Sequence, residues 1–169
     1  MFTFYLINES NARAILSWRY EPPYDLYNYS EQEANSLQHI LHSQNNFYSI
    51  VDKNSELVAY CSFGQDGQVT GGDYRDQALD IGMGIRPDLT GRGKGAEYAN
   101  AVLKFADSLF NPKACRVTIA AFNKRAIRVW QKLGFEYQQS FERENDGMQF
   151  IILLRADCCK TLPNFDNLA

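Results

Sequence analysis

In the first half of the chain, hydrophobic residues recur with two periods, and each period predicts a different element. Alternation with a period of two is typical of a half-buried strand, and a spacing of three to four residues is typical of an amphipathic helix. Ser30, followed by Glu33 three residues later, is a capping box that predicts a helix start. The predicted elements are a strand over Phe2–Asn8, a helix capped by Ser10 or Asn11 and ending at Trp18, a helix from Ser30 to about His42, and strands over Phe47–Val51 and Leu57–Phe63.

The second half begins, after a polar loop, with a strand over Leu79–Ile85, in which hydrophobic residues alternate with Asp80, Gly82 and Gly84. Pro87 has no amide hydrogen for a strand ladder, so we expect the strand to stop before it. The later predicted elements are a helix from Ala96 to Phe110, a strand from Cys115 to about Phe122, a helix capped by Asn123 and ended by Gly134, and an antiparallel pair over Phe135–Glu142 and Met148–Arg155.

This order of elements, β-α-α-β-β-β-α-β-α-β-β, predicts an α/β fold with a single mixed, mostly antiparallel central sheet and helices on both faces. The unit from Leu79 to Ala121 predicts a parallel strand pair joined by a right-handed crossover. A chain of 169 residues fits one domain with a sizeable core. We place the core in about residues 1–155 and leave residues 156–169 as a tail without a predicted element.

Composition narrows the class of protein. Hydrophobic residues make up 45% of the chain, which is typical of a globular domain and not of a disordered segment. No apolar run approaches the length of a membrane span, and the N-terminus lacks the basic start of a signal peptide. The four cysteines have no zinc-ligand spacing, so we expect reduced thiols, no metal and a cytoplasmic protein. A net charge of −3 does not favour a nucleic-acid partner.

Charge is distributed unevenly along the chain. Residues 86–132 hold ten basic and three acidic side chains, whereas the rest holds seven basic and seventeen acidic ones. Two predicted helices in this segment begin with cations, Arg92 and Lys94 at one start and Lys124 and Arg125 at the other. Acidic side chains would stabilise a helix start by about 0.3–1 kcal/mol each, so helix stability does not explain these cations. A polyanion bound at both helix starts would explain them.

A glycine-rich run, Thr90-Gly-Arg-Gly-Lys-Gly95, connects the central strand to the next helix. Glycines permit a tight turn, and a helix start offers unpaired N–H groups to an anion, so the run is a candidate phosphate loop. Two known phosphate loops do not fit it. A Walker A loop needs Ser or Thr where this chain has Gly95. A dinucleotide-binding loop needs an acidic residue about 20 positions further on, and Asn111–Arg116 offer none.

Two motifs resemble those of the GNAT superfamily of N-acetyltransferases. Thr90–Ala96 resembles the pyrophosphate loop Q/R-x-x-G-x-G/A, with Gly93 and Gly95 on the two small positions and Thr90 in place of Gln or Arg. Asn123–Phe135 resembles the signature N-x-x-A-x-x-x-Y-x-x-x-G-F. The resemblance looks closest to the branch that includes ribosomal-protein N-terminal acetyltransferases.

The resemblance implies a GNAT-like fold and transfer of the acetyl group of acetyl-CoA to a primary amine of a small molecule, protein or peptide. The implied partners are acetyl-CoA and an amine acceptor, without nucleic acid, membrane or metal, and a homodimer is left open. A CoA-binding sensor without catalysis is the alternative, because Trp130 replaces the tyrosine of the signature. The residues expected to bind acetyl-CoA are Met83, Gly84, Ile85, Thr90, Gly91, Arg92, Gly93, Lys94, Gly95, Ala96, Asn123, Arg125, Ala126 and Trp130.

In this family the acetyl group lies at a break in the central strand. Gly82–Ile85 is the candidate for this break, because a glycine in a strand marks a bulge or a close approach. Relief of crowding against a helix is the alternative. Asp80 is the first candidate for the general base, with a salt-bridged or solvated strand residue as the alternative, and Glu21 is the second. An indole is not a useful acid, so Tyr137 is a candidate for protonating the leaving thiolate.

Residues 18–29 are rich in proline and tyrosine and predict an extended loop with an aromatic surface. Aromatic faces attract a cationic amine, so Glu21, Tyr24 and Tyr27 are the candidate acceptor-binding residues. The alternative is that these tyrosines cover the edge of the core. His39 and His42 are expected to be surface or packing residues.

Overall fold

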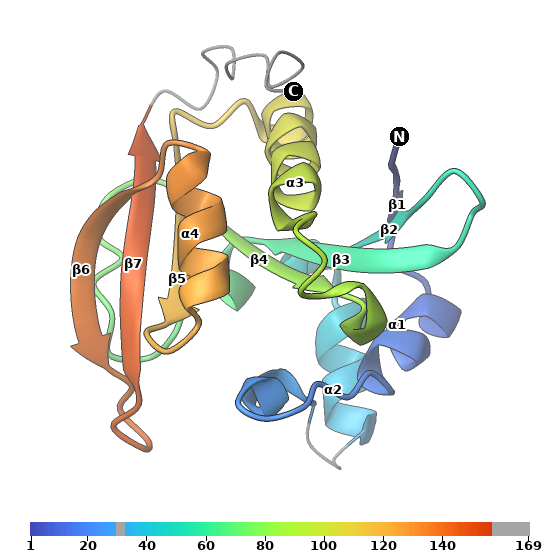
Figure 1. Cartoon of the computed structure of the whole chain (residues 1–169), viewed down its shortest axis with the longest axis horizontal. Coiled ribbons are helices and arrows are strands. Elements are labelled where there is room, and N and C mark those ends of the chain that lie inside the picture. The colour runs from blue at the N-terminus through green and yellow to red at the C-terminus, as the bar shows by residue number, and fades with distance from the viewer. Residues whose placement is uncertain (30–32, 157–169) are drawn as a thin grey trace.

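A computed structural model describes residues 1–29 and 33–156, and within these residues seven strands form one sheet in the order β1-β2-β3-β4-β5-β7-β6 (Figure 1). In this sheet β4 and β5 are parallel and the other neighbours are antiparallel. The strands are β1 (Thr3–Leu6), β2 (Tyr48–Val51), β3 (Leu57–Phe63), β4 (Leu79–Ile85), β5 (Ala114–Ala120), β6 (Glu136–Glu142) and β7 (Gln149–Ala156). The α-helices are α1 (Glu9–Leu16), α2 (Glu33–Leu41), α3 (Gly95–Phe110) and α4 (Lys124–Lys132). The predicted fold class and element order are confirmed.

Helices cover both faces of the sheet. Figure 1 shows α3 on one side of β3 and β4, and α1 and α2 on the opposite side. Because side chains alternate along a strand, β3 contributes Cys61 to the core under α3 and Tyr60 to the core under α1 and α2. The first core is the larger and also contains Ile81, Val102 and Trp130. The two faces of β4 therefore face different cores, one under α3 and one under α1 and α2.

The start of the chain differs from its prediction. The first strand is shorter than predicted, and α1 begins at Glu9 because Asn8 caps it, with its Oδ1 accepting the Asn11 backbone N–H at 2.9 Å. The predicted cap at Ser10 or Asn11 is therefore wrong. Asn8 has extended backbone and a short acceptor side chain, which is what a cap needs, and the periodicity did not show it. The helix also ends at Leu16, before Trp18.

Other helix boundaries were predicted correctly. Asn123 caps α4 by accepting the Ala126 backbone N–H at 3.1 Å, and Gly134 follows the helix in a left-handed conformation with φ of 84°. The capping box of Ser30 with Glu33 lies outside the described residues, as does most of the predicted tail. Cys61 and Cys115 are buried in the core, and Cys158 and Cys159 lie outside the described part.

Among the described residues, no helix is both long enough and apolar enough to cross a membrane. The same part of the chain contains no group of three or more His, Cys, Asp or Glu side chains placed to hold a metal ion.

Candidate functional site

The parallel strands β4 and β5 separate soon after they meet. Within the described sheet they pair at Leu79 with Cys115 and at Asp80 with Arg116, and β4 then continues to Ile85 without pairing to β5. Figure 1 shows the two strands diverging from this point. We call this divergence the β4–β5 splay. It leaves one backbone edge of β4 without a strand partner.

The hydrogen-bond pattern between β3 and β4 shows which groups lie on that edge. Gly64 donates its backbone N–H to the carbonyl of Asp80 at 2.9 Å, and Arg86 donates to the carbonyl of Val58 at 2.9 Å. Backbone groups alternate in direction along an antiparallel strand, so the even-numbered residues of β4 face β3. The backbone groups of Met83 and Ile85 consequently face the splay. The residues predicted to contact the acetyl and pantetheine arm thus present N–H groups there.

The two strand glycines serve close approach, not a bulge. The register between β3 and β4 is continuous from Ile81 to Ile85. A Cβ added at Gly82 would collide with the Ser62 hydroxyl, and one added at Gly84 would collide with the ring of Tyr60. Both obstacles are side chains of β3 on the face covered by α1 and α2. The glycines therefore relieve crowding against β3, and not against a helix as the alternative expected. The splay itself comes from the divergence of β5.

The glycine loop opens α3 with its first amides uncapped. Gly91 and Gly93 have φ values of 72° and 77°, which strain any residue with a Cβ. In the described structure the N-cap, Lys94, makes no side-chain cap hydrogen bond, so the amides of Gly95 and Ala96 are available to an anion, whereas that of Glu97 donates to the Lys94 carbonyl at 3.0 Å. A Cβ on Gly95 would lie 2.9 Å from Val129, so this glycine brings the start of α3 close to α4.

The start of α4 meets the glycine loop. The Arg125 guanidinium nitrogen lies 3.0 Å from the position that a Cβ on Gly91 would occupy. The same guanidinium covers the ring of Tyr24, 3.9 Å from its centroid, and donates from Nε to the Tyr24 hydroxyl at 2.7 Å. Arg92, Lys94 and Lys124 are exposed around it. Both helix starts and their cations therefore face one region of the surface.

Two of the ten basic residues in this segment do not contribute to that region. Arg86 pairs with Asp88 at 2.7 Å, and Arg116 is buried against Asp80. Of the remaining eight, the four that lie at the helix starts are Arg92, Lys94, Lys124 and Arg125.

The aromatic loop connects the two sides of the splay. Tyr20 donates its hydroxyl to the backbone carbonyl of Ile85 at 2.9 Å, and the Tyr27 hydroxyl accepts from the Asn123 side chain at 3.0 Å, beyond the end of β5. The Tyr20 and Tyr27 rings contact each other edge to face at 6.5 Å. Burial raises the pKa of both phenols, so they stay neutral and act as hydrogen-bonding groups. Glu21 is exposed in the same loop.

Asp80 is buried and held by several donors. Arg116 binds both of its oxygens, from Nε at 2.6 Å and from Nη2 at 2.8 Å, and Gln68 donates to it at 2.8 Å. The guanidinium also lies over the ring of Tyr74, and its hydrogen bonds to Asp80 raise the pKa of Arg116. This geometry corresponds to the salt-bridged alternative for Asp80, and its role as general base remains a prediction.

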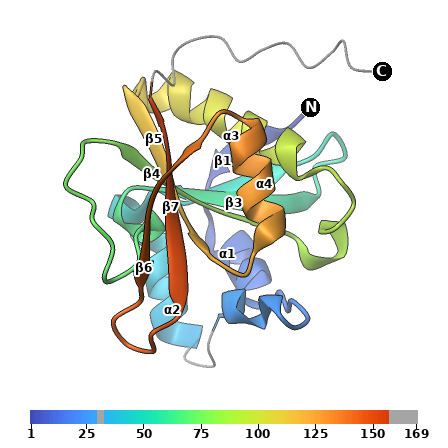
Figure 2. The same ribbon diagram turned by 60° about the vertical axis from the view of Figure 1, so that its left-hand side comes forward.

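Two other predicted residues lie apart from the splay. Tyr137 is 60% exposed on the edge strand β6, where its hydroxyl donates to Ser140. The strands β5, β7 and β6 lie side by side in both views, so β5 and β7 separate Tyr137 from β4 (Figure 1, Figure 2). Trp130 is buried in the core under α3 and α4, edge to face with Phe135 at 5.0 Å.

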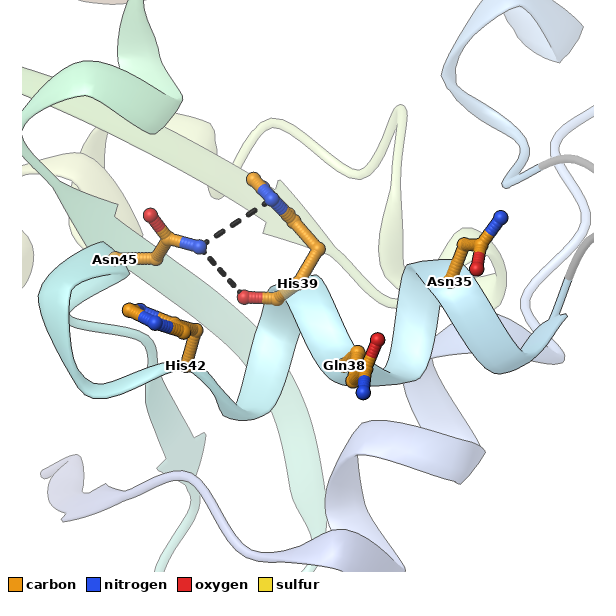
Figure 3. Close-up of a pocket in the computed structure, with 5 residues that line it drawn as sticks. All are labelled: Asn35, Gln38, His39, His42 and Asn45. Atoms are coloured by element: carbon orange, nitrogen blue, oxygen red, sulfur yellow. Dashed lines mark hydrogen bonds between the residues drawn. The ribbon is translucent and has the colours of Figure 1, made fainter.

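A polar group that no sequence motif predicted lies on the other face of β4. Asp66, in a 3-10 turn over Gln65–Gly67, accepts the hydroxyl of Ser62 and contacts His39 Nε2 at 2.6 Å. His39 also lines a groove on α2 with Asn35, Gln38, His42 and Asn45 (Figure 3). Asp66 lies in a polar loop without a motif. The one available signal was the alternation of side chains along β3, which puts Ser62 on this face.

Comparisons with known proteins agree with this geometry. Residues 4–136 match the family described as "Acetyltransferase (GNAT) domain". The chain therefore belongs to the GNAT acetyltransferase family. A search of curated proteins found no match.

Similar solved structures show the same fold at low identity. A chimera of spermidine N-acetyltransferase from Vibrio cholerae and hSSAT is 15% identical with a TM-score of 0.71, over 95% of this chain and 99% of that one. A GNAT-family acetyltransferase from Bacillus anthracis is 14% identical with a TM-score of 0.69, over 92% and 95%. The Vibrio cholerae spermidine N-acetyltransferase in complex with CoA and spermine is 17% identical with a TM-score of 0.65, over 92% and 95%.

Proposed function

We propose that the protein transfers the acetyl group of acetyl-CoA to a primary amine, by direct attack of the amine on the thioester within a ternary complex. One observation carries the proposal: Arg125 at the start of α4 lies against the uncapped glycine loop of α3, and the aromatic loop bonds both Arg125, through Tyr24, and the open edge of β4, through Tyr20. The glycine loop and Arg125 suit the phosphates of CoA, and the open edge of β4 suits its thioester arm.

Phosphate binding falls to the helix starts. The amides of the loop over Thr90–Ala96 would hold the pyrophosphate, with Arg92, Lys94 and Arg125 supplying positive charge. Thr90 donates its hydroxyl to the carbonyl of Pro87 at 2.8 Å, so its side chain shapes the loop instead of facing a ligand. Asn123 both caps α4 and contacts Tyr27, which supports an acceptor site next to the coenzyme site.

Acetyl transfer needs a polarised carbonyl and an amine that has lost a proton. The N–H groups of Met83 or Ile85 on the open edge of β4 would donate to the carbonyl oxygen as negative charge develops. Burial raises the pKa of Tyr20 and Tyr27, the phenols beside the splay, above the usual value of about 10, which itself exceeds the value of about 8.5 for an ordinary thiol, so they are poor proton donors to the leaving thiolate. The thiol proton then comes from the amine nitrogen through solvent.

One similar structure, described as a spermidine N-acetyltransferase in complex with CoA and spermine, supports an amine acceptor. The tyrosines of the aromatic loop suit a cationic amine. Placement beside ribosomal-protein N-terminal acetyltransferases stays a prediction, so a peptide belongs among the acceptors tested. A homodimer also stays a prediction, to be checked by size-exclusion chromatography; one similar structure is described as dodecameric.

A coenzyme sensor without catalysis is the second candidate. It is favoured by Trp130, which is buried where the signature has tyrosine, and by the commitment of Asp80 to Arg116. Both candidates require CoA binding, and turnover with any acceptor excludes the sensor. Thiol release would be measured with spermidine, benzylamine and a short peptide with a free N-terminus.

The CoA site is tested by a pair of matched glycine variants. Gly93 and Gly147 have similar φ values, 77° and 70°, and no described atom lies within 4 Å of a Cβ at either position. Gly93→Asp and Gly147→Asp therefore introduce the same strain and charge, one in the loop and one in the β6–β7 turn. We expect Gly93→Asp to weaken CoA binding at least 10-fold, about 1.4 kcal/mol, by charge repulsion. Calorimetry showing equal affinities for the two variants would refute the phosphate assignment.

A further inference from the structure

The polar group around Asp66 runs from β4 to the surface of α2. Asp66 Oδ2 lies 3.3 Å from the position that a Cβ on Gly82 would occupy, so the carboxylate sits directly against the backbone of β4. The next residue, Met83, is one of the two whose backbone groups face the splay. The Asp66 side chain is 18% exposed, which leaves it accessible to water or to a small amine.

Asp66 is oriented by two fixed partners. The buried hydroxyl of Ser62 donates to Oδ2, and His39 Nε2 lies 2.6 Å from Oδ1. Asp80, the other carboxylate on this face of β4, is occupied by Arg116. Asp66 is therefore the carboxylate here whose main charged partner is a titratable imidazole and not a permanent cation.

His39 connects Asp66 to solvent. Its side chain is 48% exposed, and its ring stands edge to face against Phe47 at 5.9 Å. The Asn45 amide nitrogen lies 3.3 Å from His39 Nδ1 and donates to the His39 carbonyl at 2.7 Å, as Figure 3 shows. The two ring nitrogens therefore face different sides: Nε2 faces Asp66 and can take a proton from it, and Nδ1 faces Asn45. The outer side of the ring opens on the groove of α2.

Two tyrosines complete the surroundings of the carboxylate. Tyr60 lies over Gly84 and hydrogen-bonds Tyr29, and both phenols are close enough to Asp66 for its charge to contribute to their raised pKa values, of which burial is the main cause. Among the described residues, the titratable groups that face Asp66 include two phenols, Tyr29 and Tyr60, and the imidazole of His39. Such a set can hold an ammonium group through the carboxylate and the phenol oxygens.

We infer that Asp66 takes the proton from the acceptor ammonium, directly or through one water, and that His39 passes this proton to solvent in the α2 groove. This inference rests on the proposed acetyl transfer. The ammonium gives one proton to the Asp66 carboxylate. The carboxylic acid passes that proton to His39 Nε2, and the other ring nitrogen, Nδ1, releases a proton to water in the α2 groove. The amine nitrogen then forms a bond to the acetyl carbon, the carbon–sulfur bond breaks, and the second nitrogen-bound proton leaves to the thiolate. One proton is released for each acetyl group transferred.

The test compares two histidines of the same surface. His39→Ala removes the imidazole that touches Asp66, and His42→Ala removes one that lines the same groove, where its Nδ1 faces the backbone amide of Gln44 at 3.4 Å. With the best acceptor among spermidine, benzylamine and the peptide, we expect His39→Ala to lower kcat about 10²-fold at pH 7. His42→Ala should stay within twofold of wild type. The rate of His39→Ala should rise with added imidazole and with increasing pH.

Asp66→Asn provides a second, independent readout. Its kcat/KM should rise steadily with pH, because the amine must now lose its proton in bulk water, while its affinity for CoA stays unchanged. Unaltered rates and pH profiles in both variants would overturn the inference. A loss in His39→Ala that imidazole does not restore, with an unmoved pH profile, would also overturn it, because His39 would then be structural. Absence of turnover in the wild-type protein would refute the proposed function as well, whereas active variants refute the relay alone.

Discussion

Asp80 and Arg116 should stabilise the fold more than any other ion pair described above. Their side chains are 4% and 3% exposed, and two hydrogen bonds of 2.6 and 2.8 Å join them. Asp80→Asn would leave the guanidinium charge buried without its carboxylate. Removing one partner of such a pair typically costs about 3–5 kcal/mol. For a domain of this size, each kcal/mol lowers Tm by about 2–4 °C, so we expect a fall of roughly 6–20 °C.

The assay is thermal and urea unfolding at neutral pH, with activity measured on folded protein at low temperature. Arg116→Met should destabilise to a similar extent. The double replacement Asp80→Leu with Arg116→Met should be less harmful than either single change, because no charge remains buried. Arg75→Ala is the control: Arg75 pairs with Asp73 but is 90% exposed, so Tm should not change measurably.

Asp80 thus has a structural role, and one result would refute this role. If Asp80→Asn kept the wild-type Tm and yet lost acetyl transfer at every temperature, the carboxylate would have to act on the substrate. Asp80 would then be the general base.

Three further predictions follow from other parts of the structure. Burial raises the pKa of the Cys61 thiol, so its contribution to stability is fully present below the unfolded-state pKa of about 8.5 and is lost above it, by about 1.4 kcal/mol per pH unit. In urea unfolding from pH 7 to 10, the free energy of unfolding should therefore fall less for Cys61→Ala than for wild type, and an equal fall in both proteins would contradict this. Arg125→Ala should weaken CoA binding about 10-fold in calorimetry, and Arg125→Lys should recover only part of it because an ammonium cannot keep the planar contact with Tyr24; full recovery would mean that charge alone matters. Trp130→Phe should cost about 1–2 kcal/mol of stability and leave kcat within twofold, whereas a large fall in kcat with an intact fold would place the indole at the reacting atoms.

Features set by neighbouring residues could be predicted from the sequence. The glycine loop, the Asn123 cap and the end of α4 at Gly134 depend on backbone conformations and hydrogen bonds that span a few residues. The order of strands and helices likewise follows from periodicity. The exception is the cap at the start of the chain, Asn8. Several capping residue types lie close together there, and the local pattern does not show which of them caps the helix.

Partners far apart in the chain were decided by the tertiary structure. Arg116 reaches Asp80 across 36 positions, Asp66 meets His39 across 27, and Asn123 bonds Tyr27 across 96. Alternation predicts which side of a strand a side chain takes, but not which side chain of another element comes to lie opposite it. The physical reason is that strand order and helix packing set these pairings, and both follow from burial of the whole core. The sequence by itself therefore determined the phosphate loop and the element order, and the fold decided which carboxylate is locked in an ion pair and which one faces a histidine.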